Sequence, residues 1–320
     1  MQVIIPVAGK GSRLRPHTHT TAKPLLHVAG KPVLQHILDR LEGLPVSEII
    51  FVTGHLGEQF KNLNTKYRSI AVEQKEQLGT AHAINMAKPF VKEPVLIIFA
   101  DTIFDADLSV INKTSADGLI WAKEVEDYQR FGVIIHKNNV MQKIVEKPSE
   151  PVSKLANIGL YYFKDYKALF EAIDHVVTHT KPVKGEFFLT DAMQYMIDQG
   201  KKILVEPVQG WYDCGTWEIL IATNRELLQK QSKFKAFEGS VIVPPVWIED
   251  NVIIRSSVIG PNVSVAHGVT INNSVISESI INVHAKIDSS ILTNSIVGSD
   301  AEVKGEAKKL SIGSHSVVNV

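Results

Sequence analysis

The chain has 320 residues, enough for one large domain or two ordinary ones, each able to bury a hydrophobic core. Lysine and arginine total 34, as do aspartate and glutamate, so no net charge attracts nucleic acid or an anionic membrane. One cysteine excludes an intramolecular disulfide, and no signal peptide or membrane-spanning run is evident. We therefore expect a cytoplasmic protein that binds neither nucleic acid nor membrane.

The first apolar run, residues 3–7, breaks into a turn that contains glycines and an arginine. A short apolar run ended by glycine is typical of a buried parallel strand. Gly9 and Gly11 let backbone N–H groups approach an anion, although glycines after a strand also mark ordinary tight turns. Arg13 offers a planar fork for phosphate oxygens, and Lys23 offers a compact charge. The stretch is typical of a strand that leads into a polyphosphate-binding loop.

Helices and strands alternate through the first hundred residues. A three-and-four spacing of apolar residues predicts a helix at 33–41, and a second helix is expected at about 80–87. Apolar runs predict strands at 49–52, 70–72 and 95–100. This alternation is typical of a Rossmann-like, doubly wound mixed α/β sheet, whose ligands bind beyond the carboxyl ends of the strands. Asp101 follows the last of these strands, so we expect it to share one crevice with the glycine-containing loop.

The composition changes near residues 234–240. Before this point, strands are expected at 119–122, 133–135, 140–146 and 160–163, and helices at 166–173, 190–196 and 217–228. After it, aliphatic residues recur every six positions, as at Val246, Val252 and Val258. Repeats of six are typical of a parallel β-helix, here resembling the left-handed type, whereas an ordinary all-β domain has a period of two. The sequence therefore predicts an α/β domain at 1–237 and a β-helix domain at 238–320.

Residues 9–14 read Gly-Lys-Gly-Ser-Arg-Leu, and Lys-Pro-Leu follows at 23–25. This string resembles the signature of the sugar nucleotidyltransferases, which join a nucleoside triphosphate to a sugar 1-phosphate and release pyrophosphate. It is neither a dinucleotide fingerprint, which needs a third glycine, nor a Walker loop. The two-part layout is similar to long-form glucose-1-phosphate thymidylyl- and uridylyltransferases. The resemblance implies that the triphosphate is held by Ala8, Gly9, Gly11, Arg13 and Lys23.

Residues 74–83 resemble the family's base-binding box, and they read Gln-Lys-Glu-Gln-Leu-Gly-Thr-Ala-His-Ala. The resemblance implies that Gln74 pairs with the base, while Gly79 and Thr80 bring backbone to the base edge. A glutamine amide suits the N3–H and O4 groups of uracil or thymine, which favours a pyrimidine triphosphate. A polar loop before a helix would explain Gly79 and Thr80 but not Gln74.

Asp101 and Asp213 match the family's two metal-binding aspartates, one ending a buried strand and one within Trp-Tyr-Asp-Cys-Gly-Thr. Carboxylate and phosphate oxygens together suit Mg²⁺, which uses one or two protein ligands, so we expect Mg²⁺ as the cofactor. Each aspartate also has a structural alternative, because Asp213 could cap the following helix and Asp101 could begin a turn.

The remaining sequence motifs that resemble those of the family imply a sugar-phosphate site. Lys147 resembles the lysine that binds the sugar phosphate, and Glu146 the residue that binds a sugar hydroxyl. Similar matches assign Gly132, Asn157 and Glu186 to the same site, with Asn157 near the hexose. Thr190 and Asp191, in contrast, look like the start of a helix.

The resemblance implies Mg²⁺-dependent transfer from dTTP or UTP to a sugar 1-phosphate, with glucose 1-phosphate ranked first. Transfer from UTP to an N-acetylhexosamine 1-phosphate, transfer from GTP to mannose 1-phosphate, and a non-catalytic nucleotide-sugar sensor stay as alternatives. The attacking phosphate oxygen is already ionised, so catalysis needs positioning and charge rather than a general base. Arg13, Lys23, Asp101 and Lys147 are the expected catalytic residues, and the β-helix is expected to support a homo-oligomer.

Overall fold

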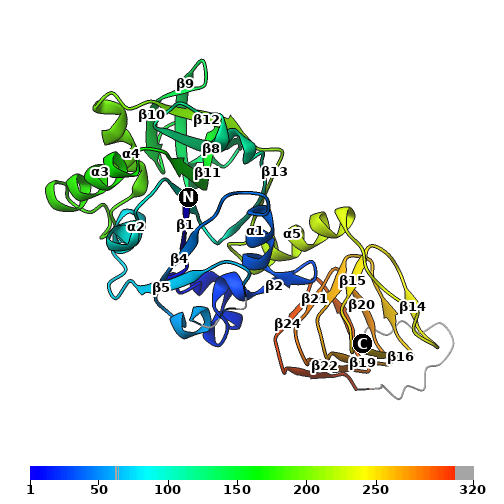
Figure 1. Cartoon of the computed structure of the whole chain (residues 1–320). Coiled ribbons are helices and arrows are strands. Elements are labelled where there is room, and N and C mark those ends of the chain that lie inside the picture. The colour runs from blue at the N-terminus through cyan, green and yellow to red at the C-terminus, as the bar shows by residue number, and fades with distance from the viewer. Residues whose placement is uncertain (62, 64, 307–320) are drawn as a thin grey trace. The chain divides into compact units, whose positions relative to one another are not determined.

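The computed structural model describes residues 1–61, 63 and 65–306, and internal contacts divide the chain into two compact units (Figure 1). The first unit comprises residues 1–26 and 32–216, and the second comprises residues 27–31 and the chain from Trp217 onward. Within the described ranges, no helix is both long enough and apolar enough to span a membrane.

A nine-stranded mixed sheet, in the order β5-β4-β1-β6-β11-β8-β12-β10-β9, forms the centre of the first unit. Its strands are β1 Gln2–Pro6, β4 Glu48–Thr53, β5 Ser69–Glu73, β6 Val95–Ile98, β8 Gly118–Glu124, β9 Gly132–Lys137, β10 Val140–Glu146, β11 Leu155–Phe163 and β12 Ile203–Pro207. β1 pairs in parallel with β4 and β6, so their carboxyl ends share one edge. β11 runs antiparallel to β6 and β8, and the predicted mixed α/β sheet is confirmed.

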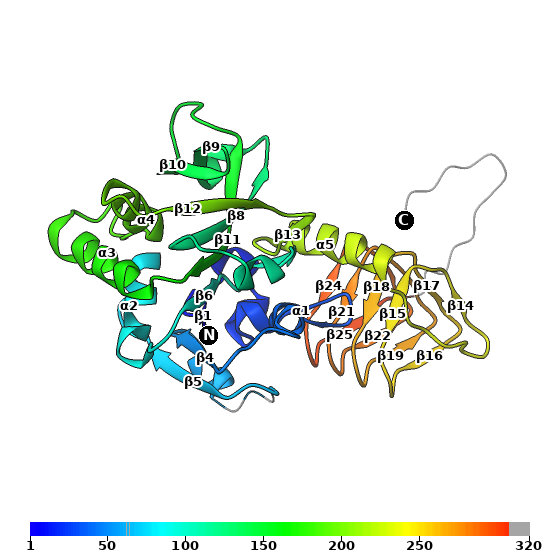
Figure 2. The ribbon, with the colours of Figure 1, turned by 45° about the horizontal axis from the view of Figure 1, so that its top comes forward.

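Continuous apolar runs explain the burial of the central strands. Val3, Ile4 and Ile5 of β1 are fully buried, and Ile4 lies opposite Ile50 of β4 and Ile97 of β6. Parallel strands covered on both faces typically show such runs. The helices of this unit are α1 Val33–Arg40, α2 Thr80–Ala87, α3 Tyr166–His179 and α4 Leu189–Asp198. α2, α3 and α4 share one apolar core with the sheet, and Figure 2 shows them on the same side of it.

A small antiparallel pair lies outside the main sheet, and the sequence did not predict it. β7, Thr102–Asp105, pairs with β13, Gly210–Asp213, and Asp213 lies directly opposite Thr102. Just beyond this pair, the N–H of Cys214 donates to the carbonyl oxygen of Asp101 at 2.9 Å. Two chain segments 113 residues apart in sequence are thereby joined at the end of β6.

The second unit contains three parallel four-stranded sheets, β14-β17-β20-β23, β15-β18-β21-β24 and β16-β19-β22-β25. Their strands are β14 Val241–Ile242, β15 Val246–Ile248, β16 Ile253–Arg255, β17 Val258–Ile259, β18 Val263–Val265, β19 Thr270–Asn272, β20 Val275–Ser277, β21 Ile280–Ile281, β22 Lys286–Asp288, β23 Ile291–Thr293, β24 Ile296–Val297 and β25 Glu302–Lys304. This is the arrangement of the predicted left-handed β-helix. Val241 pairs with Val258, 17 positions later, and Val275 with Ile291, 16 positions later. Each coil is therefore slightly shorter than three hexads, which explains the slips in the repeat.

Serine hydroxyls form a ladder along one corner of the coils. The N–H of Ser257 donates to Ser240 Oγ at 3.2 Å, and the N–H groups of Ser274 and Ser290 each donate to the preceding serine Oγ at 3.1 Å. The hydroxyl of Ser274 in turn donates to the carbonyl oxygen of Asn272 at 2.6 Å. The ladder satisfies backbone N–H groups at the corner, where the parallel sheets are interrupted.

Helix α5, Trp217–Lys230, and the hairpin of β2, His27–Val28, with β3, Lys31–Pro32, pack with the β-helix. The fully buried Asn224 of α5 accepts from the N–H of Ala29 at 2.8 Å and donates to the carbonyl oxygen of Asn262 at 3.2 Å. The compact units therefore divide before α5, whereas the predicted domains divide after residue 237. Polar contacts made by α5 account for the difference.

Replacing Gly30 with alanine should lower the free energy of unfolding. Gly30 has a φ of +89°, and a Cβ there would lie 2.1 Å from Trp247 Nε1. The backbone strain costs about 1–2 kcal/mol, and displacing the indole costs about 1–3 kcal/mol more. Gly239→Ala is the matched control, because Gly239 has a φ of +69° with no atom within 4 Å of the added Cβ. Equal shifts of the two variants in urea denaturation would contradict the expected clash.

Candidate functional site

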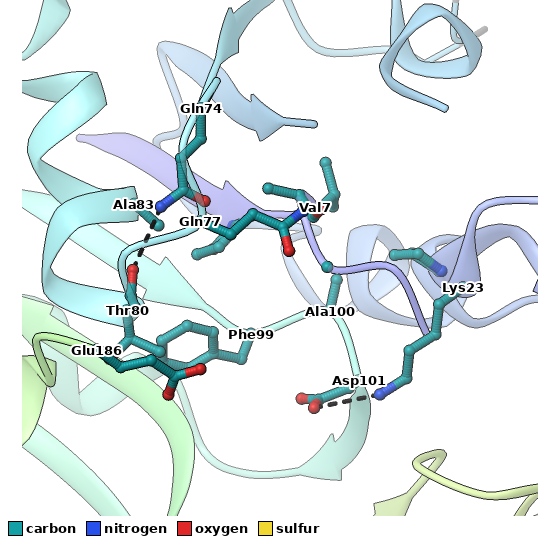
Figure 3. A pocket seen from close by; sticks show the side chains of 15 residues that line it. Val7, Lys23, Gln74, Gln77, Thr80, Ala83, Phe99, Ala100, Asp101 and Glu186 are labelled. Atoms are coloured by element: carbon teal, nitrogen blue, oxygen red, sulfur yellow. Dashed lines mark hydrogen bonds and ion pairs between the residues drawn. The ribbon is translucent and has the colours of Figure 1, made fainter. Parts of the chain in front are cut away.

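Two neighbouring cavities open at the carboxyl edge of the parallel strands. The first is lined by the predicted nucleotide residues Ala8, Gly9, Gln74, Gly79 and Thr80, with Lys23, Asp101 and Glu186 (Figure 3). The second is lined by the predicted residues Gly132, Glu146, Asn157 and Asp213. Thr80, Phe99 and Asp101 line both cavities, so the cavities meet there. Three of the predicted site residues, Gly11, Arg13 and Lys147, line neither cavity.

The loop after β1 has one position that only glycine fits. Gly11 has a φ of +60°, and a Cβ there would lie 2.9 Å from Thr18 Cγ2 and 3.2 Å from Lys23 Cβ. The Thr18 hydroxyl donates to the carbonyl oxygen of Gly11 at 2.8 Å and fixes the turn. Arg13 follows on an exposed short 3-10 helix, and its charge helps to lower the pKa of Asp101. Gly11 therefore shapes the loop, and Arg13 acts on the site through its charge.

Lys23 and Asp101 form an ion pair where the two cavities meet. Lys23 Nζ lies 3.3 Å from Asp101 Oδ2, and Figure 3 shows the two side chains turned towards each other. The Lys23 ammonium is the main reason why the pKa of Asp101 lies below its usual value. The exposed fraction of the Asp101 side chain is 52%, so water screens the pair and the carboxylate stays accessible to another ligand.

Asp213 also has a cationic partner, which the sequence did not predict. Arg130 Nη2 lies 3.2 Å from Asp213 Oδ2, and Arg130 Nη1 lies 2.8 Å from Asp127 Oδ2. The guanidinium also lies over the ring of Phe131, 5.2 Å from its centroid. Arg130 directly precedes the Phe131-Gly132 turn, and that position was the available sequence signal.

The donor set at Asp101 and Asp213 agrees with Mg²⁺ only when a substrate adds oxygen ligands. Across residues 1–61, 63 and 65–306, no group of three histidine, cysteine, aspartate or glutamate side chains could hold a metal alone. Pairing of β7 with β13 nevertheless places the two aspartates beside each other at one wall of the second cavity. Mg²⁺ commonly uses one or two carboxylates together with substrate phosphate oxygens. Its binding here stays a prediction.

Glu146 and Asn157 are held by a polar network in the second cavity. Asn157 Nδ2 donates to the carbonyl oxygen of Gly132 at 2.9 Å, and the Tyr161 hydroxyl donates to Asn157 Oδ1. The Thr190 hydroxyl donates to Glu146 Oε2 at 3.1 Å, so Thr190 contacts the site as well as beginning α4. Burial raises the pKa of Glu146, and this is the largest of the effects on it.

Lys147 and Glu186 were both predicted to belong to the sugar-phosphate site, but neither side chain lines the second cavity. Lys147 has a φ of +42°, and its Nζ lies 3.7 Å from Glu146 Oε1 and 5.1 Å from the centroid of the Phe188 ring. A non-glycine residue at positive φ is strained, and such strain is common at functional sites. Glu186 lines the first cavity, where its Cβ lies close to the Gly79 turn. Their roles in binding stay predictions.

Two buried donors in the second cavity lack protein partners. Thr102 Oγ1 and Trp211 Nε1 are buried and make no hydrogen bond to any described residue. Both side chains line the second cavity, beside Asp213. A buried donor left unpaired costs about 1–3 kcal/mol, so these two groups favour a polar occupant. The sequence analysis singled out neither side chain, because their exposure and partners follow from the pairing of β7 with β13.

Known proteins match this chain over a range that includes both cavities. The family model described as Nucleotidyl transferase matches residues 2–230. The Bifunctional protein GlmU of Methanocaldococcus jannaschii is 36% identical over 263 residues, 81% of this chain and 60% of that protein. The UTP--glucose-1-phosphate uridylyltransferase AglF of Haloferax volcanii is 32% identical over 222 residues, 66% of this chain and 89% of that protein. The chain thus spans about three fifths of the first of these relatives.

Solved structures agree with these matches. A crystal structure of UDP-glucose pyrophosphorylase complexed with UDP-glucose has a TM-score of 0.62 and 26% identity, covering 72% of this chain and 99% of that one. A putative glucose-1-phosphate thymidylyltransferase from Bacillus anthracis has a TM-score of 0.62 and 26% identity, covering 74% and 98%. The resemblance inferred from the sequence motifs is confirmed at the level of the family and the fold.

The Glu146 carboxyl should titrate above the value of about 4.3 typical of an exposed glutamate, because burial disfavours its charged form. The carboxylate form is therefore lost at a higher pH than in an exposed glutamate. Lys147→Met should raise the pKa of Glu146 further, because the Lys147 charge favours the carboxylate. Carbon-detected NMR titration measures both values. A Glu146 pKa that falls in Lys147→Met would contradict this electrostatic assignment.

Proposed function

The chain belongs to the nucleotidyl transferase family, and from that premise we propose that it joins UTP or dTTP to a sugar 1-phosphate. The products are a nucleotide-sugar and pyrophosphate, and glucose 1-phosphate is the proposed sugar substrate. The observation that carries the proposal is the meeting of the two cavities at Asp101. A triphosphate in the first cavity and a sugar phosphate in the second would bring their reacting phosphates together at this residue.

The glutamine amides of the first cavity support a pyrimidine base. Gln74 is 5% exposed and lines the cavity, and Gln77 lies beside it with its Nε2 donating to the carbonyl oxygen of Ala8 at 2.8 Å. Glutamine oxygens accept a hydrogen bond from the N3–H of uracil or thymine. The names of the relatives, UDP-glucose pyrophosphorylase and UTP--glucose-1-phosphate uridylyltransferase, point to the same class of triphosphate.

The charged residues suit transfer between phosphates. Lys23 and Arg13 would hold the triphosphate, and Lys147 would bind the phosphate of the sugar. The attacking oxygen belongs to an ionised phosphate, so the side chains position and neutralise charge without removing a proton. Mg²⁺, held by Asp101 and Asp213, would withdraw charge from the α-phosphoryl group when bound.

An N-acetylhexosamine 1-phosphate is the second candidate for the sugar substrate. Relatives that carry the name Bifunctional protein GlmU are 36% identical to this chain, a closer match than AglF at 32%.

A pyrophosphate-release assay with five triphosphates and a panel of sugar 1-phosphates tests the proposal. Release with UTP or dTTP and glucose 1-phosphate is expected, at rates above those with CTP, ATP or GTP. Faster turnover of N-acetylglucosamine 1-phosphate would replace the sugar but keep the reaction. Binding of a nucleotide-sugar without pyrophosphate release under any combination would show a sensor instead of an enzyme.

In the same assay, Asp101→Asn should lower turnover on the order of 10²–10³-fold, because it removes a charged oxygen ligand at the reacting phosphates. Asp250→Asn, a change at an exposed β-helix residue, serves as the control for a lost negative charge. Circular dichroism should show both variants folded. Near-normal turnover of Asp101→Asn in saturating Mg²⁺ would contradict the metal assignment.

We also propose that the chain forms a homo-oligomer through the sheet β14-β17-β20-β23. Val241, Val275 and Ile291 form part of one outward column on this sheet, with exposed fractions of 57%, 43% and 84%. The sheet β15-β18-β21-β24 contacts α5, and the third sheet carries charges such as Lys286 and Glu302. The apolar sheet is therefore the one suited to contact a second copy.

The double substitution Val275→Lys and Ile291→Lys should shift the protein towards the monomer in sedimentation velocity, because charge on the apolar column opposes association. Asn272→Lys, on the charged sheet, should sediment like the unmodified protein. An unchanged sedimentation coefficient in the double variant would remove this sheet from the contact.

A further inference from the structure

We propose that His82 is the positioning residue for base selection, because it locks the side-chain amide of Gln74 in one of its two orientations. The proposal rests on the nucleotide role of the first cavity. Within the proposed reaction, it explains how a glutamine, which carries both a donor and an acceptor, can discriminate between pyrimidines.

Both partners of the Gln74 amide come from the start of α2. Gln74 Nε2 lies 3.3 Å from the carbonyl oxygen of Gly79 and 3.0 Å from His82 Nδ1. A carbonyl oxygen can only accept, so the NH₂ end of the amide must face Gly79. Its second N–H then faces His82, whose Nδ1 must be the unprotonated acceptor, with the ring proton on Nε2. The two contacts together use both hydrogens of the amide.

The orientation leaves the amide oxygen of Gln74 for the ligand. In the described part of the chain, Gln74 Oε1 accepts no hydrogen bond, and Figure 3 shows it turned towards the middle of the cavity. Gln77 is arranged in the same way, because its Nε2 donates to the carbonyl oxygen of Ala8 and its side-chain oxygen, Oε1, points into the cavity. The polar edge that a base meets is therefore formed by two acceptors.

An acceptor that faces N3 of the bound base discriminates between pyrimidines of similar size. Uracil and thymine present a donor at N3, which can bond to an amide oxygen, whereas cytosine presents an acceptor at N3. Cytosine facing a locked amide oxygen would therefore set two acceptors against each other. If the amide turned over, Gln74 would present its NH₂ group and the preference would weaken.

His82 makes the shorter of the two contacts that prevent this rotation. The Gly79 contact is long at 3.3 Å, and Gln74 is only 5% exposed, so water has little access to replace a lost partner. Without the Nδ1 acceptor, one amide N–H would lack a partner in the locked orientation. Removal of the imidazole leaves only the long Gly79 contact to hold the NH₂ end of the amide, so we expect the amide to turn over more readily when a cytosine binds.

The test compares His82→Leu, which removes the acceptor, with His82→Asn, whose Oδ1 can occupy the position of Nδ1. Steady-state assays with UTP and CTP give the ratio of their kcat/KM values, and calorimetry gives the ratio of their Kd values. We expect His82→Leu to lower both ratios about tenfold, mainly through KM, and His82→Asn to restore them.

The outcomes separate this inference from the proposed function. Equal losses for UTP and CTP in His82→Leu, or unchanged ratios, would overturn the positioning role, since a merely structural residue affects both nucleotides alike. Unmodified protein that binds neither nucleotide would overturn the proposed function and the inference together. If the unmodified protein prefers UTP to CTP and neither variant changes that preference, the proposed function stands and the role of His82 alone is overturned.

Discussion

The hydrogen bond from the N–H of Cys214 to the carbonyl oxygen of Asp101 is the contact on which the site depends. It extends the pairing of β7 with β13 to the end of β6, the point at which the parallel strands release their carboxyl ends. Asp213 is thereby carried to the wall shared with Asp101, and Trp211 to the second cavity. The carboxylates are brought together by backbone pairing rather than by attraction between side chains, which as like charges would repel each other.

Charge compensation at the site follows from this arrangement. Each aspartate is paired with a cation, Asp101 with Lys23 and Asp213 with Arg130. All four side chains are at least partly exposed, so the pairs contribute little stability and can exchange partners readily. The same cations are attracted by phosphate oxygens. Lys23 and Arg130 can therefore turn from the aspartates to an anionic ligand that enters the cavities. Because the aspartates are partly exposed, this exchange leaves no buried charge without a partner.

Motifs that lie next to one another in sequence were predictable, and contacts between distant segments were not. The bounds of α2 agreed with the expected 80–87, and Asp101 and Gln74 lie where the ends of predicted strands indicated. The partner of Asp213 was missed because Arg130 lies 83 residues away in sequence and meets Asp213 only in the folded chain. Helix α5 was expected in the α/β domain, and its contacts with the β-helix were not foreseen, since an apolar face shows burial but not what covers it. Likewise, nothing in the sequence around His82 indicates that its ring meets an amide eight residues earlier.

The serine ladder has a consequence for how the β-helix can change in evolution. Each rung joins a hydroxyl to the backbone of the next coil, 16 or 17 residues on, so every coil serves as a template for its successor. Gain or loss of a complete coil leaves all remaining rungs in register, whereas an insertion of one residue within a coil moves a hydroxyl away from its N–H. The unit is therefore free to lengthen or shorten by whole turns, as a stack of interchangeable layers does.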